Sequence, residues 1–96
     1  MHVISRKKLV DFWRKHPQAK GPLIFWFKIA KRSKWRTFAE VRQGWGSADQ
    51  VRKYVVFDIG GNKYRLIAVI HYNRQKLFIR YVLTHGEYDK EDWKFD

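Results

Sequence analysis

The sequence predicts an α+β protein in which two N-terminal helices pack on a small antiparallel β-sheet meander, because the spacing of its apolar residues changes once along the chain. Up to residue 30, apolar residues recur with the period of a helix. From Val51 onward they alternate with polar residues, as in half-buried strands. Turn signals at 60–62 and 73–75 are short, which favours antiparallel neighbours. We therefore expect residues 1–96 to form one domain.

The chain is expected to begin with a strand and a helix. Residues 1–4 are apolar enough for an edge strand, and Ser5 is a reasonable N-cap for the helix that follows. The apolar face of this helix is formed by Leu9, Val10, Phe12 and Trp13. Pro17 ends the helix near His16, because the residue before a proline disfavours helical backbone.

A second helix is predicted by another set of apolar residues at helical spacing. Its buried face is formed by Ala19, Leu23, Trp26, Phe27 and Ala30. Pro22 can occupy the first turn, where its missing N–H breaks no helical hydrogen bond. Residues 37–43 are expected to form a short third helix. A loop is then marked by Gly44, Gly46 and Ser47.

Three strands are expected at residues 52–59, 63–72 and 76–84. The Gly-Gly-Asn sequence at 60–62 joins the first two, and a turn at 73–75 joins the second and third. The glycines permit the positive φ angles of a tight hairpin. This segment is not a phosphate-binding loop, because it lacks the required spacing and a strand follows it.

Strand parity predicts which side chains share a face of the sheet. The set of the middle strand is Tyr64, Leu66, Ala68, Ile70 and Tyr72, and that of the last strand is Leu77, Ile79, Tyr81 and Leu83. If both sets face the helices, Arg65, Arg80 and Thr84 share the opposite face. His85 and Tyr88 then lie just beyond the end of the last strand. This face is half cationic and half apolar, so we expect it to be open to a ligand.

The charge of the chain indicates a polyanionic partner. Lys and Arg number 21 against nine Asp and Glu, a net charge of +12. All the basic residues except Lys90 and Lys94 fall in residues 1–86, together with only four acids, so that part carries a net charge of +15. Such self-repulsion opposes folding but attracts polyanions. Nucleic acid is therefore the leading partner and an acidic protein the second, whereas a membrane surface is less favoured because no single amphipathic helix carries the charge.

Several classes of protein are disfavoured by what the sequence lacks. No apolar run approaches the roughly 20 residues that cross a bilayer, and the opening has no apolar stretch typical of a secretory signal. There is no cysteine, so nothing indicates an oxidising compartment. The four histidines lack metal-binding spacing. We expect a cytoplasmic protein with no cofactor, no metal and no membrane association.

Arg65 and Arg80 are predicted to lie on adjacent strands of the outward face. Two guanidinium groups at such a distance repel by about 1 kcal/mol or more at an effective dielectric constant of about 20. A phosphate would relieve the repulsion, since a planar guanidinium binds two of its oxygens at once. The alternative is that each arginine pairs with a carboxylate or lies over apolar neighbours. Because carboxylates are scarce in residues 1–86, we favour phosphate binding.

His85, Tyr88 and Asp89 form a candidate acid–base cluster. RNA cleavage without a metal requires a base to take the 2′-OH proton, an acid to protonate the leaving 5′-oxygen, and cations around the transition state. One histidine, one tyrosine and two or three Arg or Lys residues can supply all three. A structural role in a turn is the commoner use of such a pair, so the chemistry alone leaves both interpretations open.

A basic and aromatic stretch, "KIAKRSKWRTF", occupies residues 28–38. Its cations, Lys34 and Arg36 among them, are suited to follow a nucleic-acid backbone. Trp35 or Phe38 would then stack on a base. Alternatively Trp35 closes the core while the cations are solvated, and both interpretations stand for this tryptophan.

Two long segments, "YVVFDIGGNKYRLIAVIHY" and "FIRYVLTHGEYDKEDW", resemble the HigB family of bacterial toxins. The opening "MHVISRKKLVDFWRKHP" and the central "WRTFAEVRQ" and "SADQV" fit as well, so the resemblance covers nearly the whole chain. One departure is Asp58, where the family usually has asparagine before "IGGN". We expect Asp58 to lie outside the functional site.

The resemblance implies a RelE-like fold with RNA on the sheet face turned away from the helices. Family members are mRNA endonucleases that generally act in the ribosomal decoding site and are silenced by a HigA antitoxin, so mRNA, ribosomal RNA and a HigA-like protein are the expected partners. Arg65 would clamp the phosphate and stabilise the transition state. His85 and Tyr88 would be the acid–base or stacking pair, in an order that the sequence leaves open. Electrostatic support would come from Lys63, Arg80 and Lys90.

Two other functions use the same residues. A non-catalytic RNA- or ribosome-binding module needs only the cations. A toxin of the same fold can instead act on a protein such as gyrase, because fold does not determine function.

Overall fold

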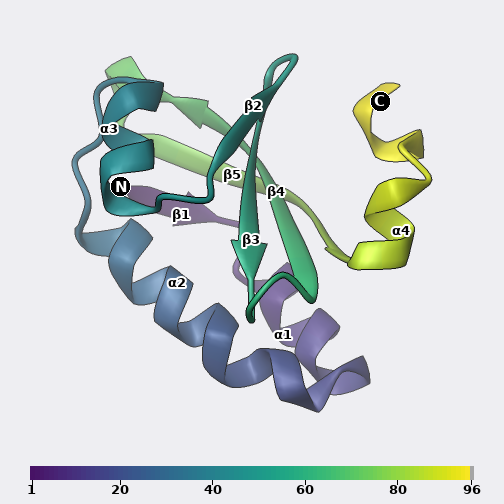
Figure 1. The fold of residues 1–96 in the computed structure, drawn as a ribbon. Helices are drawn as coiled ribbons and strands as arrows, with labels where there is room; N and C mark the ends of the chain where they lie inside the picture. The colour runs from purple at the N-terminus through teal and green to yellow at the C-terminus, as the bar shows by residue number, and fades with distance from the viewer. Residues whose placement is uncertain (96) are drawn as a thin grey trace.

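A five-stranded sheet divides the part of the chain that the computed structural model describes, residues 1–95, into two layers. The strand order is β1-β5-β4-β3-β2, with β1 at His2–Ile4, β2 at Asp49–Val51, β3 at Tyr54–Ile59, β4 at Tyr64–His71 and β5 at Lys76–Thr84. The helices are α1 at Lys7–Lys15, α2 at Lys20–Arg32, α3 at Phe38–Gly44 and α4 at His85–Asp89. The long helices α1 and α2 lie against one face, and α4 lies on the other side (Figure 1).

The sheet is mixed, so the prediction of a wholly antiparallel meander was wrong at one edge. Strands β2 to β5 are antiparallel as expected, but β1 pairs in parallel with β5, with Val3 opposite Leu77. The terminal amine of Met1 donates to the carbonyls of Ala30 and Lys31 at the end of α2. A strand joined to its neighbour by a long connection is free to run in either direction, and this anchor at the end of α2 holds the start of β1.

The junction between β1 and α1 differs from the prediction. Ser5 has a positive φ of 74° and is not the N-cap, a position held by Arg6 without a side-chain cap. The Ser5 carbonyl accepts a hydrogen bond from the Lys8 N–H at 2.9 Å, which closes the turn from strand into helix. At its other end α1 stops at Lys15, and Pro17 opens a 3-10 turn leading into α2, as predicted.

Two further predictions were confirmed: Pro22 lies in the first turn of the second helix, and a short third helix follows, expected at 37–43 and found at Phe38–Gly44. The Thr37 hydroxyl caps α3 by accepting from the Glu40 N–H at 3.2 Å. The Glu40 carboxylate in turn accepts from the Arg36 N–H at 2.8 Å, so the short helix is held at its start from both directions.

The expected strand at 52–59 is in fact the second half of a hairpin. The chain reverses at Arg52, which has a positive φ of 55°, so that β2 pairs with β3. The three residues of β2 are too few for alternation to reveal a strand. The predicted turn at 60–62 is confirmed, because all three of its residues have positive φ, namely Gly60, Gly61 and Asn62.

The main core lies between the sheet and the helices α1 to α3. Its largest fully buried side chains include Trp26 of α2 and Phe57 of β3, whose rings meet edge to face at 5.3 Å. Trp35 also stacks on Phe57, with ring centres 6.1 Å apart, and is 5% exposed. Trp35 therefore closes the core, which is the structural one of its two predicted roles.

A β-bulge in β5 changes the predicted faces of that strand. The register with β4 runs from Ile67 opposite Tyr81 to Ala68 opposite Ile79, so it skips Arg80. A one-residue insertion inverts the parity of everything beyond it. Tyr81 and Leu83 were predicted to face the helices and instead face outward, whereas Val82 turns inward and packs against the main core.

Thr84 was also assigned to the wrong face. It pairs with Tyr64, whose ring belongs to the core on the helix side, so the bulge places Thr84 on that side as well. The sequence hides this shift, because apolar residues occupy every position from 77 to 79 and from 81 to 83. Either parity therefore gives an apolar strand.

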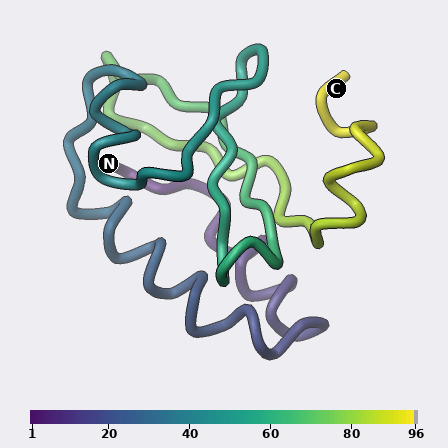
Figure 2. The backbone as a smooth tube through the Cα atoms, in the orientation of Figure 1, coloured from purple at the N-terminus to yellow at the C-terminus, as the bar shows by residue number. Residues whose placement is uncertain are grey.

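The outward face of the sheet is partly covered, although it was expected to be open. A second cluster of buried side chains lies there, formed by Tyr54, Val56, Ile67 and Trp93. Trp93 belongs to a 3-10 turn at Asp92–Phe95, and its indole N–H donates to the Tyr88 carbonyl at 3.0 Å. The described chain thus ends on the side of the sheet away from α2 (Figure 2).

Candidate active site

Arg65 lies on the outward face, as predicted, but its guanidinium is bound by its own hairpin. The residue is 7% exposed, and its Nε donates to Oδ1 of Asp58 on β3 at 3.0 Å. Nη1 donates to the carbonyls of Asn62 and Tyr64 at 3.0 and 3.1 Å, and Nη2 donates to the Asn62 side-chain oxygen at 2.5 Å. Four of the five N–H groups of a guanidinium are therefore engaged.

Asp58 therefore belongs to the site, and the expectation that it lies outside was wrong. Asp58 and Arg65 are directly opposite in the β3–β4 ladder. Counting outward from the turn at 60–62 would have found this pair, because the turn places Ile59 opposite Tyr64 and thus residue 58 opposite residue 65.

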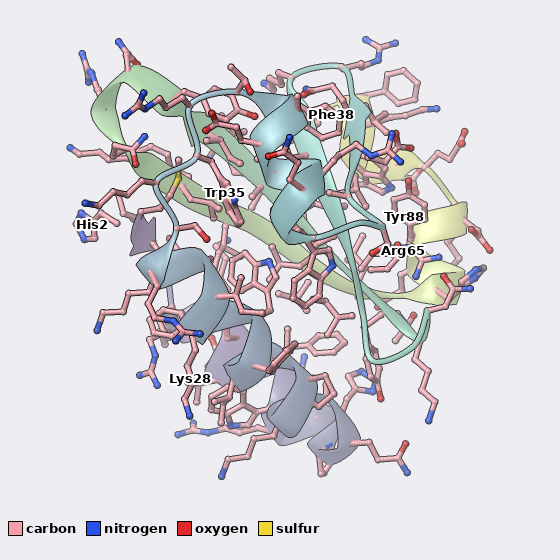
Figure 3. All side chains as sticks on the ribbon, turned by 60° about the vertical axis from the view of Figure 1, so that its left-hand side comes forward. His2, Lys28, Trp35, Phe38, Arg65 and Tyr88 are labelled. Atoms are coloured by element: carbon pink, nitrogen blue, oxygen red, sulfur yellow. The ribbon has the colours of Figure 1, made fainter. Side chains whose placement is uncertain are left out.

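Tyr88 of α4 covers the guanidinium of Arg65. The Arg65 Cζ atom lies 5.3 Å from the centre of the Tyr88 ring, and that ring stacks on Trp93 at 5.1 Å. Figure 3 shows Arg65 and Tyr88 side by side, from the sheet and from α4. Burial is the main cause that raises the Tyr88 pKa above its usual value, while Arg65 acts in the opposite direction. The phenol therefore stays protonated at neutral pH.

His85 starts α4 and is held beside the Gly-Gly-Asn turn. Its backbone N–H donates to the Lys63 carbonyl at 3.1 Å. Its Nδ1 lies 2.9 Å from the Asp89 carboxylate, and both side chains are about half exposed. Asp89 thus orients the imidazole, and Nε2 has no hydrogen-bond partner among residues 1–95.

A capping box fixes the short helix that carries His85 and Tyr88. The Thr84 hydroxyl accepts from the Glu87 N–H at 3.2 Å, and the Glu87 carboxylate accepts from the Thr84 N–H at 2.9 Å. The bond from the Thr84 backbone is the largest influence that lowers the Glu87 pKa. Through this box and the Lys63 contact, the helix is tied to the ends of both β4 and β5.

Of the cations predicted to support the site, Lys63 and Lys90 lie beside it and Arg80 does not. Lys63 and Lys90 are exposed, one in the turn that contacts His85 and one directly after α4, so both flank the site. Arg80 does not join them. As the bulged residue it lines a groove of about 290 Å³ together with Lys8 and Lys15 of α1, and also a hollow of about 170 Å³ together with Lys53 and Tyr81. The predicted pair of arginines on adjacent strands is therefore absent from residues 1–95, since Arg65 lies opposite Leu83 and has Asp58 as its partner.

Lys34 and Arg36 lie at the other end of the sheet. The carbonyl of Trp35, between them, accepts a hydrogen bond from the Gln75 side chain in the β4–β5 turn at 2.7 Å. Arg65 and His85 are at the opposite end of β4, which is about 25 Å long at roughly 3.3 Å per residue. One RNA linkage thus cannot contact both groups of cations.

A larger groove adjoins the other side of Asp58. It has a volume of about 770 Å³ and is lined by Pro22, Phe25, Ile29, Trp45, Asp58 and Asn62 together with glycines and Ser47. The Trp45 indole donates to the Asp58 carbonyl at 3.1 Å and holds the main chain at this point. Asp58 and Asn62, which bind Arg65, therefore also border open space.

Neither a cluster of metal ligands nor a membrane-spanning helix is found among residues 1–95. Within residues 1–95, no three His, Cys, Asp or Glu side chains are grouped so as to hold a metal ion. No helix in this part of the chain is long and apolar enough to cross a membrane.

The fold and the site define a small basic α+β protein that collects a guanidinium, an imidazole and a phenol at one end of its sheet. The family model HigB_toxin, described as the RelE-like toxic component of a toxin–antitoxin system, matches residues 19–91. The chain therefore belongs to the HigB toxin family, as its motifs predicted.

Two relatives are similar to this chain over nearly its whole length. The mRNA interferase toxin HigB of Escherichia coli K12 is 34% identical over 92 residues, which cover 93% of this chain and 88% of the relative. The mRNA interferase HigB of the uropathogenic strain CFT073 is 31% identical over 93 residues, covering 94% and 90%. The similarity thus includes both hairpins and α4.

Proposed function

We propose that this toxin is an endoribonuclease that cleaves mRNA and thereby stops translation and growth. Both relatives described above carry the name mRNA interferase. The net charge of +12 suits an RNA substrate. The observation that carries the proposal is the position of α4, which supports the exposed His85 imidazole next to the Lys63 turn and the Tyr88 phenol on Arg65.

The chemistry that fits these groups needs no metal. His85 Nε2 takes the proton of a ribose 2′-OH, whose oxygen attacks the adjacent phosphorus while the bond to the 5′-oxygen breaks. The products are a 2′,3′-cyclic phosphate and a 5′-hydroxyl, which receives a proton from a donor at the site. The raised pKa of Tyr88 supports a role as donor or stacking group rather than as base. Arg65, Lys63 and Lys90 would stabilise the charge of the transition state.

The distribution of cations supports a large RNA partner such as the translating ribosome. Lys34 and Arg36 lie at the far end of the sheet from His85, so they are suited to contact RNA other than the cleaved linkage. We assign them to ribosomal RNA, with the message at His85 and Arg65. According to this proposal the toxin acts in the cytoplasm, where its natural silencer would be a HigA-like antitoxin.

The proposal can be tested with one exposed residue of the site. Wild type and His85→Ala are induced in growing cells, and new 5′ ends of messages are mapped. We expect growth arrest with cuts in translated messages for wild type, and about 10²-fold or greater loss of cutting for His85→Ala, since an acid–base group contributes that much. His2→Ala, which removes an exposed histidine on β1, is the matched control.

Three further outcomes would contradict the proposal. Intact messages beside arrested growth would indicate a protein target such as gyrase. Binding of the wild type to translating ribosomes without any new message ends would indicate a non-catalytic module. Purified toxin whose cutting requires a metal ion, shown by loss with a chelator and recovery with the ion, would contradict the acid–base mechanism.

A further inference from the structure

The ion pair between Asp58 and Arg65 occupies a guanidinium that could otherwise bind an RNA phosphate. We propose that Asp58 is a positioning residue that competes with RNA phosphate for the Arg65 guanidinium and so limits the affinity and the cleavage rate of the toxin. The inference rests on the proposed function for the identity of the anion as an RNA phosphate. The contacts of the guanidinium carry the rest.

Arg65 has no free edge for a phosphate. A bidentate grip needs two adjacent N–H groups, either those of Nη1 and Nη2 or those of Nε and Nη2. The first edge is occupied because both Nη1 bonds go to the carbonyls of Asn62 and Tyr64. The second is occupied because Nε donates to Asp58 and Nη2 donates to Asn62. A phosphate must therefore displace a partner.

Asp58 is the partner that can leave. The Asn62 and Tyr64 acceptors include main-chain groups of the turn and strand that define the hairpin. The Asp58 side chain is 32% exposed, compared with 9% for Arg65, and its residue borders the groove beside Trp45. Because its side chain is partly exposed, a displaced carboxylate can be hydrated, while the Trp45 bond to the Asp58 carbonyl keeps the main chain in place.

The charge of Asp58 determines how strongly it competes. While Asp58 is paired, the positive charge of Arg65 is neutralised within the protein and releases no counterion when RNA binds. An asparagine at this position can still accept the Nε hydrogen bond with its side-chain oxygen, so the hairpin keeps its contacts. It carries no charge, so it competes with a phosphate more weakly than a carboxylate does.

The experiment compares the RNA affinity of Asp58→Asn with that of wild type over a range of salt concentrations. The probe is a labelled single-stranded RNA in which 2′-deoxy nucleotides block cleavage. We expect Asp58→Asn to bind about three- to tenfold tighter, and its log affinity to fall more steeply with log salt by about 0.7, the value for one more neutralised phosphate. Equal affinity and equal slope, or weaker binding, would overturn the inference.

Glu40→Gln is the matched control, because it removes one negative charge at the start of α3 and leaves a side chain that can still accept the Arg36 hydrogen bond. A comparable gain in this variant would show that overall charge, rather than Arg65, causes the effect and would overturn the inference. Asp58→Glu, which keeps the charge, should bind like wild type. Thermal unfolding of each variant verifies that it is folded.

Cleavage of an unmodified message on translating ribosomes separates this inference from the proposed function. If the wild type cleaves, Asp58→Asn should cleave faster at limiting RNA, and failure to do so contradicts the role of Asp58. If no variant cleaves, the proposed function fails, while the difference in salt slope still decides whether Asp58 competes with phosphate.

Discussion

The two hairpins that share β4 place their arginines in opposite environments. In the β3–β4 hairpin the register is unbroken, which puts Arg65 opposite Asp58, and the end of this hairpin is covered by Tyr88. In the β4–β5 hairpin a bulge skips Arg80 and leaves it exposed beside a groove of α1. One guanidinium is thus part of the folded framework, and the other is a surface cation.

The different environments give the two arginines different contributions to the stability of the fold and to RNA binding. A buried guanidinium with four internal hydrogen bonds contributes to folding and holds its position precisely because its neighbours fix it. An exposed guanidinium gives little stability but is free to follow a phosphate. Substitution of Arg65 should therefore lower the stability of the fold as well as affect RNA binding, whereas substitution of Arg80 should affect RNA binding with little change in stability, and the following predictions use this contrast.

The largest effect is expected for Arg65→Ala. The substitution leaves the Asp58 carboxylate and the carbonyl groups around it without their donor, which should lower the free energy of unfolding by about 2–4 kcal/mol. Urea unfolding measures the loss. Arg80→Ala is the paired control and should stay within about 0.5 kcal/mol of wild type. Similar losses in both variants would contradict the contrast between the hairpins.

A smaller effect is expected for RNA binding by Arg80→Ala. Loss of one exposed cation should lower the affinity for single-stranded RNA a few-fold at low salt and reduce the salt slope by about 0.7. Fluorescence anisotropy at several salt concentrations measures both quantities. Arg42→Ala removes an exposed cation from α3 instead, away from the groove that Arg80 lines. If both variants lose the same amount of affinity, RNA binding depends on the total charge of the protein and not on the position of Arg80.

The smallest effect concerns the helix that covers Arg65. The folded Glu87 pKa lies below its ordinary value of 4.5, so the stabilisation from the capping box is present above that value and is lost as pH falls through the lowered pKa. Glu87→Gln should therefore flatten the decline of melting temperature between roughly pH 5 and pH 3. An unchanged decline in the variant would show that the carboxylate of Glu87 contributes nothing to it.

Much of the architecture follows from local sequence patterns. The helical period and Pro17 locate α1 and α2, and the Gly-Gly-Asn turn locates the β3–β4 hairpin. Arg65 was placed on the outward face because parity runs unbroken from that turn. The partnership with Asp58 was available from the same register. These features depend on residues close together in the chain, whose spacing the sequence displays directly.

Other features required contacts between distant residues. The N-terminal amine holds the start of β1 at the end of α2, and the stack of Tyr88 on Trp93 covers part of the outward face that was expected to be open. The bulge at Arg80 is invisible in a strand whose neighbouring positions are apolar in either parity. None of these features alters the spacing of apolar residues along the chain, so the periodicity of the sequence cannot reveal them.

The sequence by itself therefore determined the helices α1 to α3, the strands β3 to β5, the basic character of the chain and the family, because these depend on composition, period and motif. Only the tertiary structure decided which cations share a site and which are neutralised. The physical reason is that the field at a guanidinium depends on the nearest opposite charge and on burial, and both are set by strand register and by the packing of α4.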